Sequence, residues 1–170
     1  PPGKAGIAHL VEHMMFQHRM LGPDKPPTFD LLPQIALTFN AYTTYDKTHY
    51  YLVGSKEDLE TLLKVEAFRM NALCETVPKE QFDRERDVVR NEIRQRGGTP
   101  EGLMPDLVLQ AVYPKGHPYS HTTGGNDEQL ASITFEDVCT FMNRYYTPER
   151  ATVVVTRNVD PQNAGRMIKS

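Results

Sequence analysis

His9-Leu10-Val11-Glu12-His13 puts two imidazoles and one carboxylate on a single turn of a predicted helix. Residues three and four positions apart are neighbours on a helix, so His9, Glu12 and His13 can all face one space. Imidazole nitrogens are good ligands for a borderline-soft divalent ion such as Zn²⁺. A carboxylate beside them that does not bind the metal can take a proton from a metal-bound water. The alternative is an ordinary amphipathic helix whose histidines have structural partners.

A zinc site of this kind needs a third protein ligand, and the best candidates lie in residues 82–93. Glu85 and Glu92 are seven positions apart, so they share one face of a helix over two turns. The segment has an apolar stripe that should pack against another element, made of Phe82, Val88, Val89 and Ile93. A carboxylate on such a stripe costs free energy unless it is paired or bound to metal. On this chemistry alone either glutamate could be the third ligand, and a solvated, charged helix is the alternative.

Five blocks of the chain follow one another in a recognisable order. They are GIAHLVEHMMF (6–16), NAYTTYDKTHYY (40–51), ERDVVRNEI (85–93), HPYS (117–120) and YTPERA (146–151). Together they resemble the catalytic domain of the M16 zinc peptidases, the family of pitrilysin, insulysin and mitochondrial processing peptidase. His-x-x-Glu-His is the reverse of the commoner His-Glu-x-x-His zinc motif and marks a separate class. Residues 34–39 depart from the family, because the Gly pair expected there is missing.

The resemblance implies a role for each polar residue of the first and third blocks. His9, His13 and Glu92 are expected to hold one Zn²⁺ per chain, and Glu12 is expected to be the general base. Glu85 is then expected to orient one of these ligands without binding the metal itself. The resemblance therefore makes Glu92, and not Glu85, the expected third ligand.

The resemblance also implies that the strand starting at Asn40 and Ala41 binds the substrate. A peptide can join such an edge as an added strand, held by backbone groups and by the Asn side chain. Without the resemblance, these residues mark only a junction between a turn and a strand. The expected function is a zinc-dependent endopeptidase in which Glu12 activates a zinc-bound water and which cleaves extended peptides or unfolded segments.

The family further implies a second M16-like half, fused or supplied as a separate subunit in a homo- or heterodimer. We therefore expect residues 1–170 to form a single catalytic domain of a larger protein, weak or inactive by itself. One alternative is a zinc- and peptide-binding module with negligible turnover. Another is a structural role, as in family members that have lost their zinc ligands, although the complete His-His-Glu set argues against it.

Composition is that of one globular domain: 170 residues, 39% hydrophobic and 24% charged, with a formal net charge of −3. This charge gives no reason to expect a nucleic-acid partner, and no apolar run is long enough to predict a membrane span. The chain starts at Pro1 rather than Met, so we expect a fragment or a processed product. Cys74 and Cys139 are expected to be buried thiols rather than a disulfide, and two cysteines leave the cellular compartment undecided.

The order of patterns predicts an α+β fold, with a mixed, largely antiparallel sheet packed against several helices and incomplete at both ends. The predicted helices cover about 5–18, 29–36, 55–73, 78–97, 101–112 and 134–145, and a last one begins at Asp160-Pro161. The predicted strands are 39–45 and 48–53, joined as a hairpin by Asp46-Lys47, and 151–156. Residues 113–126 are expected to be an irregular loop.

Overall fold

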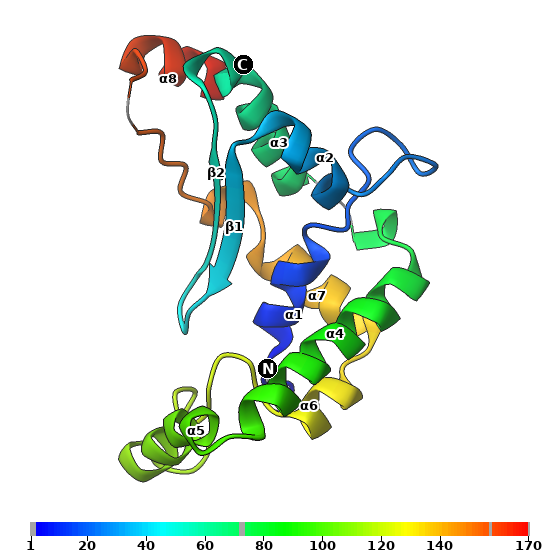
Figure 1. Cartoon of the computed structure of the whole chain (residues 1–170), viewed down its shortest axis with the longest axis vertical. Helices are drawn as coiled ribbons and strands as arrows, with labels where there is room; N and C mark the ends of the chain where they lie inside the picture. Colours follow the sequence, from blue (N-terminus) through cyan, green and yellow to red (C-terminus); the bar gives the residue numbers. More distant parts are fainter. Residues whose placement is uncertain (1–2, 72–73, 157, 170) are drawn as a thin grey trace.

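A computed structural model describes residues 3–71, 74–156 and 158–169. Within these ranges it contains eight α-helices and one two-stranded antiparallel sheet (Figure 1). The helices are α1 (Ile7–Met14), α2 (Thr28–Ile35), α3 (Leu59–Asn71), α4 (Lys79–Gly97), α5 (Pro100–Val112), α6 (Asp127–Ser132), α7 (Phe135–Tyr145) and α8 (Pro161–Lys169). Short 3-10 turns lie at Lys56–Asp58, Cys74–Thr76 and Pro148–Arg150. The predicted α+β class is confirmed.

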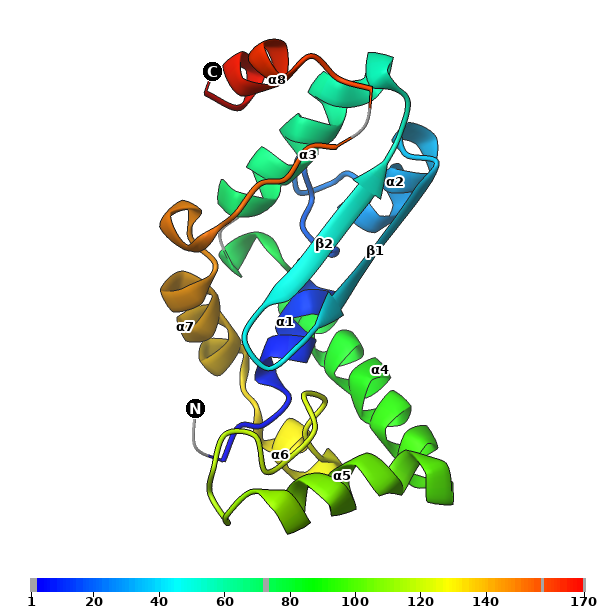
Figure 2. The same cartoon turned by 90° about the vertical axis from the view of Figure 1, so that its left-hand side faces the viewer.

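The sheet is a hairpin of β1 (Thr38–Thr43) and β2 (Thr48–Val53). Figure 2 shows it running across α1, with its turn toward the loop between α5 and α6. At that turn the Tyr119 hydroxyl donates to Asp46 Oδ1 at 2.7 Å. Along β1, successive side chains alternate between the inner and outer faces, so Phe39 and Thr43 face inward while Asn40 is exposed. The hairpin prediction is confirmed to within two residues.

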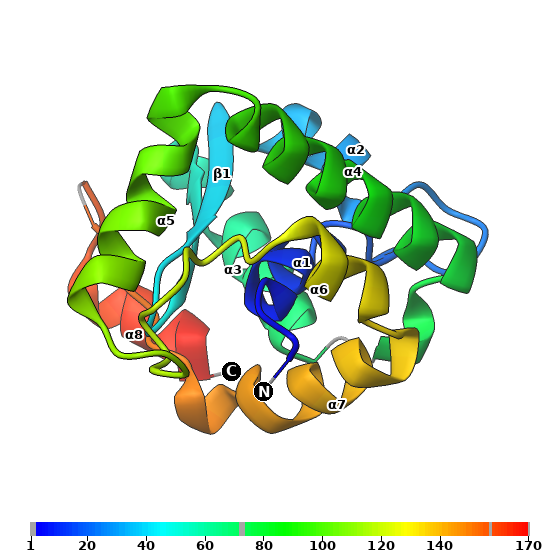
Figure 3. The ribbon, with the colours of Figure 1, turned by 90° about the horizontal axis from the view of Figure 1, so that it is seen from below.

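Helix α1 is the centre of the core. Its buried side chains include Leu10, Val11 and Met14, and it contacts both α4 and α7, between which it lies in Figure 3. The helix begins after Gly6, whose φ of 89° is left-handed and suits a residue without Cβ. A Cβ at Gly6 would also lie 2.5 Å from the Gly124 carbonyl oxygen. The sequence at this junction therefore fixes where the helix carrying the motif starts.

The predicted helix 5–18 is too long at both ends. Gly6 sets the true start, and after Met14 the backbone tightens: the Gln17 N–H donates to the Met14 carbonyl. His18 then turns into the core, fully buried, with its Nδ1 2.8 Å from Thr76 Oγ1. The helix predicted for 55–73 appears as a 3-10 turn followed by α3, and residues 72–73 lie outside the described part.

Two further predictions differ from the structure. Residues 151–156 are extended, but they form no β-ladder with any described residue, and Val153 and Val154 are 52% and 73% exposed. A β-branched segment becomes a strand only where a partner strand offers its backbone groups. Helix α6 was not predicted, although the Asn126 side chain accepts from the Gln129 N–H and caps it. Among the described residues, no helix is long and apolar enough to span a bilayer.

The expectation of two free thiols is wrong. Cys74 and Cys139 form a disulfide that links the 3-10 turn before α4 to α7. Their Cα atoms are 5.2 Å apart, within the usual range for such a bond. The pairing follows from the way α7 packs against the turn that holds Cys74, and residues 65 apart in sequence carry no local sign of that packing.

Candidate metal centre

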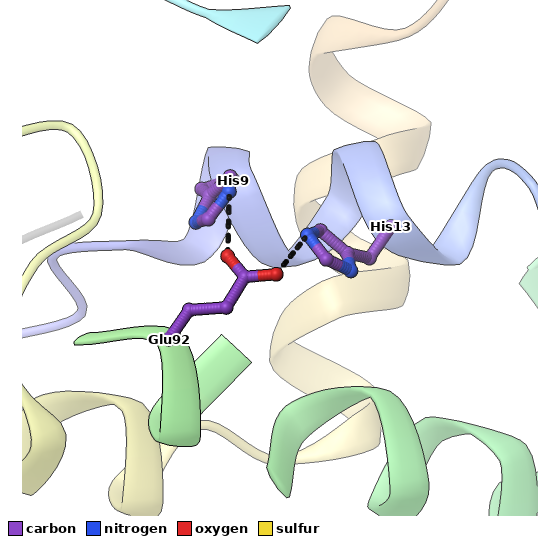
Figure 4. Close-up of side chains that lie close together, drawn as sticks. All are labelled: His9, His13 and Glu92. Atoms are coloured by element: carbon purple, nitrogen blue, oxygen red, sulfur yellow. Dashed lines mark ion pairs between the residues drawn. The ribbon is translucent and has the colours of Figure 1, made fainter. Parts of the chain in front are cut away.

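His9 and His13 project from α1 toward Glu92 of α4 (Figure 4). His9 Nε2 lies 3.8 Å from one Glu92 carboxylate oxygen, and His13 Nε2 lies 3.8 Å from the other. One ligand atom from each of the three residues lies within 4.8 Å of the others. The structure thus brings together the three residues predicted to be zinc ligands.

The spacing of apolar residues explains this convergence. On α1, Leu10 and Val11 are fully buried, which leaves the His9–His13 face pointing sideways, toward α4. On α4, Phe82 and Val89 are buried, and Glu92 follows Val89 by three residues, one turn along the same face. Packing of two amphipathic helices therefore directs these side chains at one another.

The three side chains fit a shared cation better than they fit one another. A separation of 3.8 Å is too long for a hydrogen bond, so the carboxylate oxygens and imidazole nitrogens converge without satisfying each other. Two atoms bound to one tetrahedral Zn²⁺ through bonds of ~2.0–2.1 Å are about 3.4 Å apart. The two nitrogen–oxygen separations of 3.8 Å are close to that value. The nitrogen and oxygen donors are also those that Zn²⁺ prefers.

Glu85 lies behind His13, on the side away from this convergence. Its Oε2 is 3.4 Å from His13 Nδ1, while its Oε1 accepts from Gln81 Nε2 at 3.0 Å. A carboxylate against the far nitrogen fixes the ring orientation and raises the basicity of a metal-binding histidine. His9 has no such support: its buried Nδ1 has no hydrogen-bond partner among the described residues.

The two histidines have different electrostatic surroundings. Burial, with smaller effects from the charges of His13 and Arg96, lowers the pKa of His9 to about 4. Burial alone would also lower the pKa of His13. The nearby carboxylates together outweigh burial and raise this pKa; they are Glu85, Glu92 and Glu12. His9 is therefore neutral near pH 7, with a lone pair available for a metal.

Glu12 lies on the same helical turn but takes no part in the convergence. It is 8% exposed, and the Thr43 hydroxyl donates to its Oε2 at 2.5 Å. Burial raises the pKa of Glu12, although the bond from Thr43 and the charge of His13 oppose the rise. The sequence did not predict the contact with Thr43. The alternation of side chains along the strand could have predicted it, because Thr43 lies two residues after Ala41 and shares its inward face.

Asn40 and Ala41 lie at the outer edge of β1. The Thr44 N–H donates to the Lys47 carbonyl at the turn, and along an antiparallel pair bonded and non-bonded residue pairs alternate. Ala41 and Tyr50 are therefore a non-bonded pair, and the N–H and C=O of Ala41 point away from β2. The Ala41 N–H donates instead to Asn40 Oδ1 at 2.8 Å. The outer edge of β1 therefore offers backbone groups to a partner, but the Ala41 N–H is already bonded to the side-chain amide of Asn40.

Comparison with known proteins places these features in a family. The family described as Insulinase (Peptidase family M16) matches residues 1–125. The chain is 31% identical over 169 residues to "Zinc protease PqqE" of Helicobacter pylori, covering 98% of the chain and 37% of that relative. The crystal structure of a protease from H. pylori superimposes with a TM-score of 0.88 at 32% identity, over 98% of this chain and 39% of that one.

A second solved structure extends the likeness in fold. The first half of the periplasmic protease PqqL from Escherichia coli has a TM-score of 0.79 at 23% identity, covering 99% of this chain and 37% of that chain. The chain spans about a third of the length of the curated relatives it matches.

Proposed function

The chain belongs to the insulinase-like peptidase family M16, and from that premise we propose that it is the zinc-dependent catalytic domain of an endopeptidase. The observation that carries this proposal is the convergence of His9, His13 and Glu92. The zinc proteases among the relatives support the choice of metal.

In this proposal His9, His13 and Glu92 hold one zinc ion per chain. When bound, the ion would lower the pKa of a water molecule and polarise the carbonyl of the scissile bond. Glu85 holds the His13 ring through its 3.4 Å contact, so the ring keeps the orientation that points Nε2 at the site.

Glu12 is the proposed general base. It takes a proton from the attacking water and later passes it to the leaving amine, because the same carboxyl group can act in both directions. Its burial supports this role, since a pKa raised above the ordinary range brings a carboxyl group closer to the pH at which it must exchange protons.

The proposed substrate is an extended peptide or an unfolded segment. Such a chain would pair with the outer edge of β1, where the backbone groups of Ala41 point away from β2. The exposed Asn40 amide lies beside them and can bond to the substrate backbone. Recognition through backbone groups does not depend on the substrate's side chains, so many sequences fit.

Residues 1–170 are proposed to be one domain that works with a second M16-like half, fused or separate. The short span relative to the relatives supports this, as does the solved first half of PqqL. One observation favours the alternative of a zinc- and peptide-binding module: the Glu92 side chain is 36% exposed, so the described residues leave the site open to solvent. Peptide hydrolysis needs the reacting groups enclosed and positioned.

The test is zinc content measured by atomic absorption on purified variants. The unmutated chain, Glu12→Gln and Glu80→Ala are expected to bind about one zinc each, because Glu80 is an exposed carboxylate elsewhere on α4. His9→Ala, His13→Ala and Glu92→Ala are expected to lose it. Full zinc content in Glu92→Ala, or loss of zinc in Glu12→Gln, would contradict the assignment. Cleavage of a fluorogenic peptide, absent in Glu12→Gln, then separates the peptidase from the binding module.

A further inference from the structure

A row of three hydroxyl groups ends at the carboxylate of Glu12. Thr43 Oγ1 is 2.5 Å from Glu12 Oε2, Thr48 Oγ1 is 3.3 Å from Thr43 Oγ1, and the Tyr146 hydroxyl is 2.7 Å from Thr48 Oγ1. The row joins three elements, α1, β1 and β2, and the residue that caps the C-terminal end of α7. Groups from distant parts of the sequence therefore meet at one carboxylate.

The direction of each bond follows from the number of protons available. An ionised carboxylate only accepts hydrogen bonds, so the Thr43 hydroxyl must give its single proton to Glu12. The Thr43 oxygen is then left to accept from Thr48, and the Thr48 oxygen to accept from Tyr146. Burial raises the pKa of Tyr146 to about 12, so its phenol keeps its proton at physiological pH. All three protons thus point toward Glu12.

The register of the hairpin makes the row possible. Thr43 and Thr48 are directly opposite each other, in a pair whose backbones do not bond to each other. Side chains are closest in such pairs. Both residues are half-buried on the sheet face that packs on α1. A row of bonds that share one direction strengthens each member, because every donor is polarised by the one behind it.

We propose that Thr43 is a positioning residue for the general base, and that Thr48 and Tyr146 orient its hydroxyl. The proposal rests on the proposed function, because it presumes that Glu12 moves the proton. The bond from Thr43 holds Oε2 and so fixes the rotation of the carboxylate, which leaves Oε1 for the reacting water. Zinc binding and peptide binding use other residues and should not depend on the row.

The first measurement needs no metal and no turnover. The Glu12 carboxyl carbon is followed by NMR against pH in the metal-free chain, with Glu12→Gln used to assign the signal. Thr43→Val keeps the shape of the side chain but removes the donor to the ionised form, so the titration midpoint should rise. Thr43→Ser should leave it near its original value. Thr140→Val, an exposed change on α7, is the matched control and should not move it.

The second measurement is kinetic, on the zinc-loaded complete polypeptide with an internally quenched, unstructured peptide. Thr43→Val should lower kcat by about 10–100-fold, the range seen when a residue that orients a metal ligand is removed and taken here for the general base, with KM and zinc content unchanged. Thr43→Ser should restore most of the rate. Tyr146→Phe should cost less than Thr43→Val, and it tests the row even if Thr43→Val does not fold.

The outcomes separate this proposal from the function on which it rests. An inactive Glu12→Gln beside a Thr43→Val with unchanged kcat and midpoint would overturn the positioning role alone. Equal losses in Thr43→Ser and Thr43→Val would also overturn it, because they would show that shape rather than the hydroxyl matters. A fully active Glu12→Gln would overturn the proposed function, and the positioning role with it.

Discussion

Removing the Cys74–Cys139 disulfide should destabilise the domain strongly. The bond joins residues 65 apart, with Cys74 fully buried in the core. Closing a loop of that length removes entropy from the unfolded chain, and the chain-entropy relation gives a stabilisation of about 4 kcal/mol at 25 °C. That is a large share of the ~5–15 kcal/mol typical of a folded domain.

The assay is urea unfolding followed by circular dichroism, with the double variant Cys74→Ala/Cys139→Ala compared with the oxidised chain. With an m value of about 2 kcal/mol per molar, the midpoint should fall by about 2 M. Reducing the unmutated chain should produce a similar fall with no atoms removed, whereas the double variant should not respond to reductant. This pair of controls separates the cross-link from any cavity left by the substitutions.

Two results would refute the reasoning. One is a double variant whose free energy of unfolding lies within about 1 kcal/mol of the oxidised chain, below the ~2–5 kcal/mol expected for loss of a native disulfide. The other is a thiol titration that finds both cysteines free in the native protein after oxidative refolding.

Three other changes have expected outcomes. Glu85→Gln should weaken zinc affinity by roughly 10–100-fold without abolishing binding, because it removes the partner of His13 and not a ligand. Competition with a chromophoric chelator measures this affinity. A loss as complete as in Glu92→Ala would show that the roles of Glu85 and Glu92 are reversed. Asp137→Asn should lower the unfolding free energy by ~0.5–2 kcal/mol near pH 7, because it weakens the capping box with Thr134 and the ion pair with Lys4. These contacts lower the pKa of Asp137 to about 2, so its contribution is present above pH ~4 and should fade as pH falls toward 2; equal destabilisation at pH 7 and pH 2 would contradict this. The isolated chain should cleave a fluorogenic peptide far more slowly than the complete polypeptide, since removing even one oxyanion donor typically costs about 10²–10³ in turnover, and full activity of the chain alone would contradict the need for a second half.

Much of the fold was predictable because its signals are local. Pro78 and Gly97 bound α4, and the capping box of Thr134 and Asp137 marks the start of α7. The position of a helix start depends on a few neighbouring residues and their hydrogen bonds, which the sequence displays directly. The hairpin was equally visible from two runs of aromatic and β-branched residues on either side of Asp46-Lys47.

The candidate site was predictable for a related reason. His9 and His13 share a helical face because of their spacing alone, and the packing stripe of α4 directs Glu92 at them. Family resemblance was still needed to prefer Glu92 over Glu85, because both lie on that stripe. The geometry now places Glu92 in the convergence and Glu85 behind His13, while the roles of both stay predictions.

The features that the sequence did not reveal depend on contacts between distant segments. The disulfide requires α7 to pack beside the turn holding Cys74, and the bond from Thr43 to Glu12 requires the hairpin to lie across α1. Residues 151–156 were, in contrast, predicted to be a strand and form no β-ladder with any described residue. Their β-branched composition suits a strand, but pairing depends on a partner's backbone, which local propensity does not report.

The covered amide at the edge of β1 also bears on how the protein behaves in concentrated solution. An open strand edge is a template for any extended chain, including another copy of the same protein, and natural proteins shield such edges against aggregation. Asn40 shields one group of this edge, because its Oδ1 accepts a hydrogen bond from the outward N–H of Ala41. Only a chain that can take over this hydrogen bond gains the whole edge. The side chain proposed to bind the substrate is therefore also expected to make pairing with a second copy of the protein less favourable.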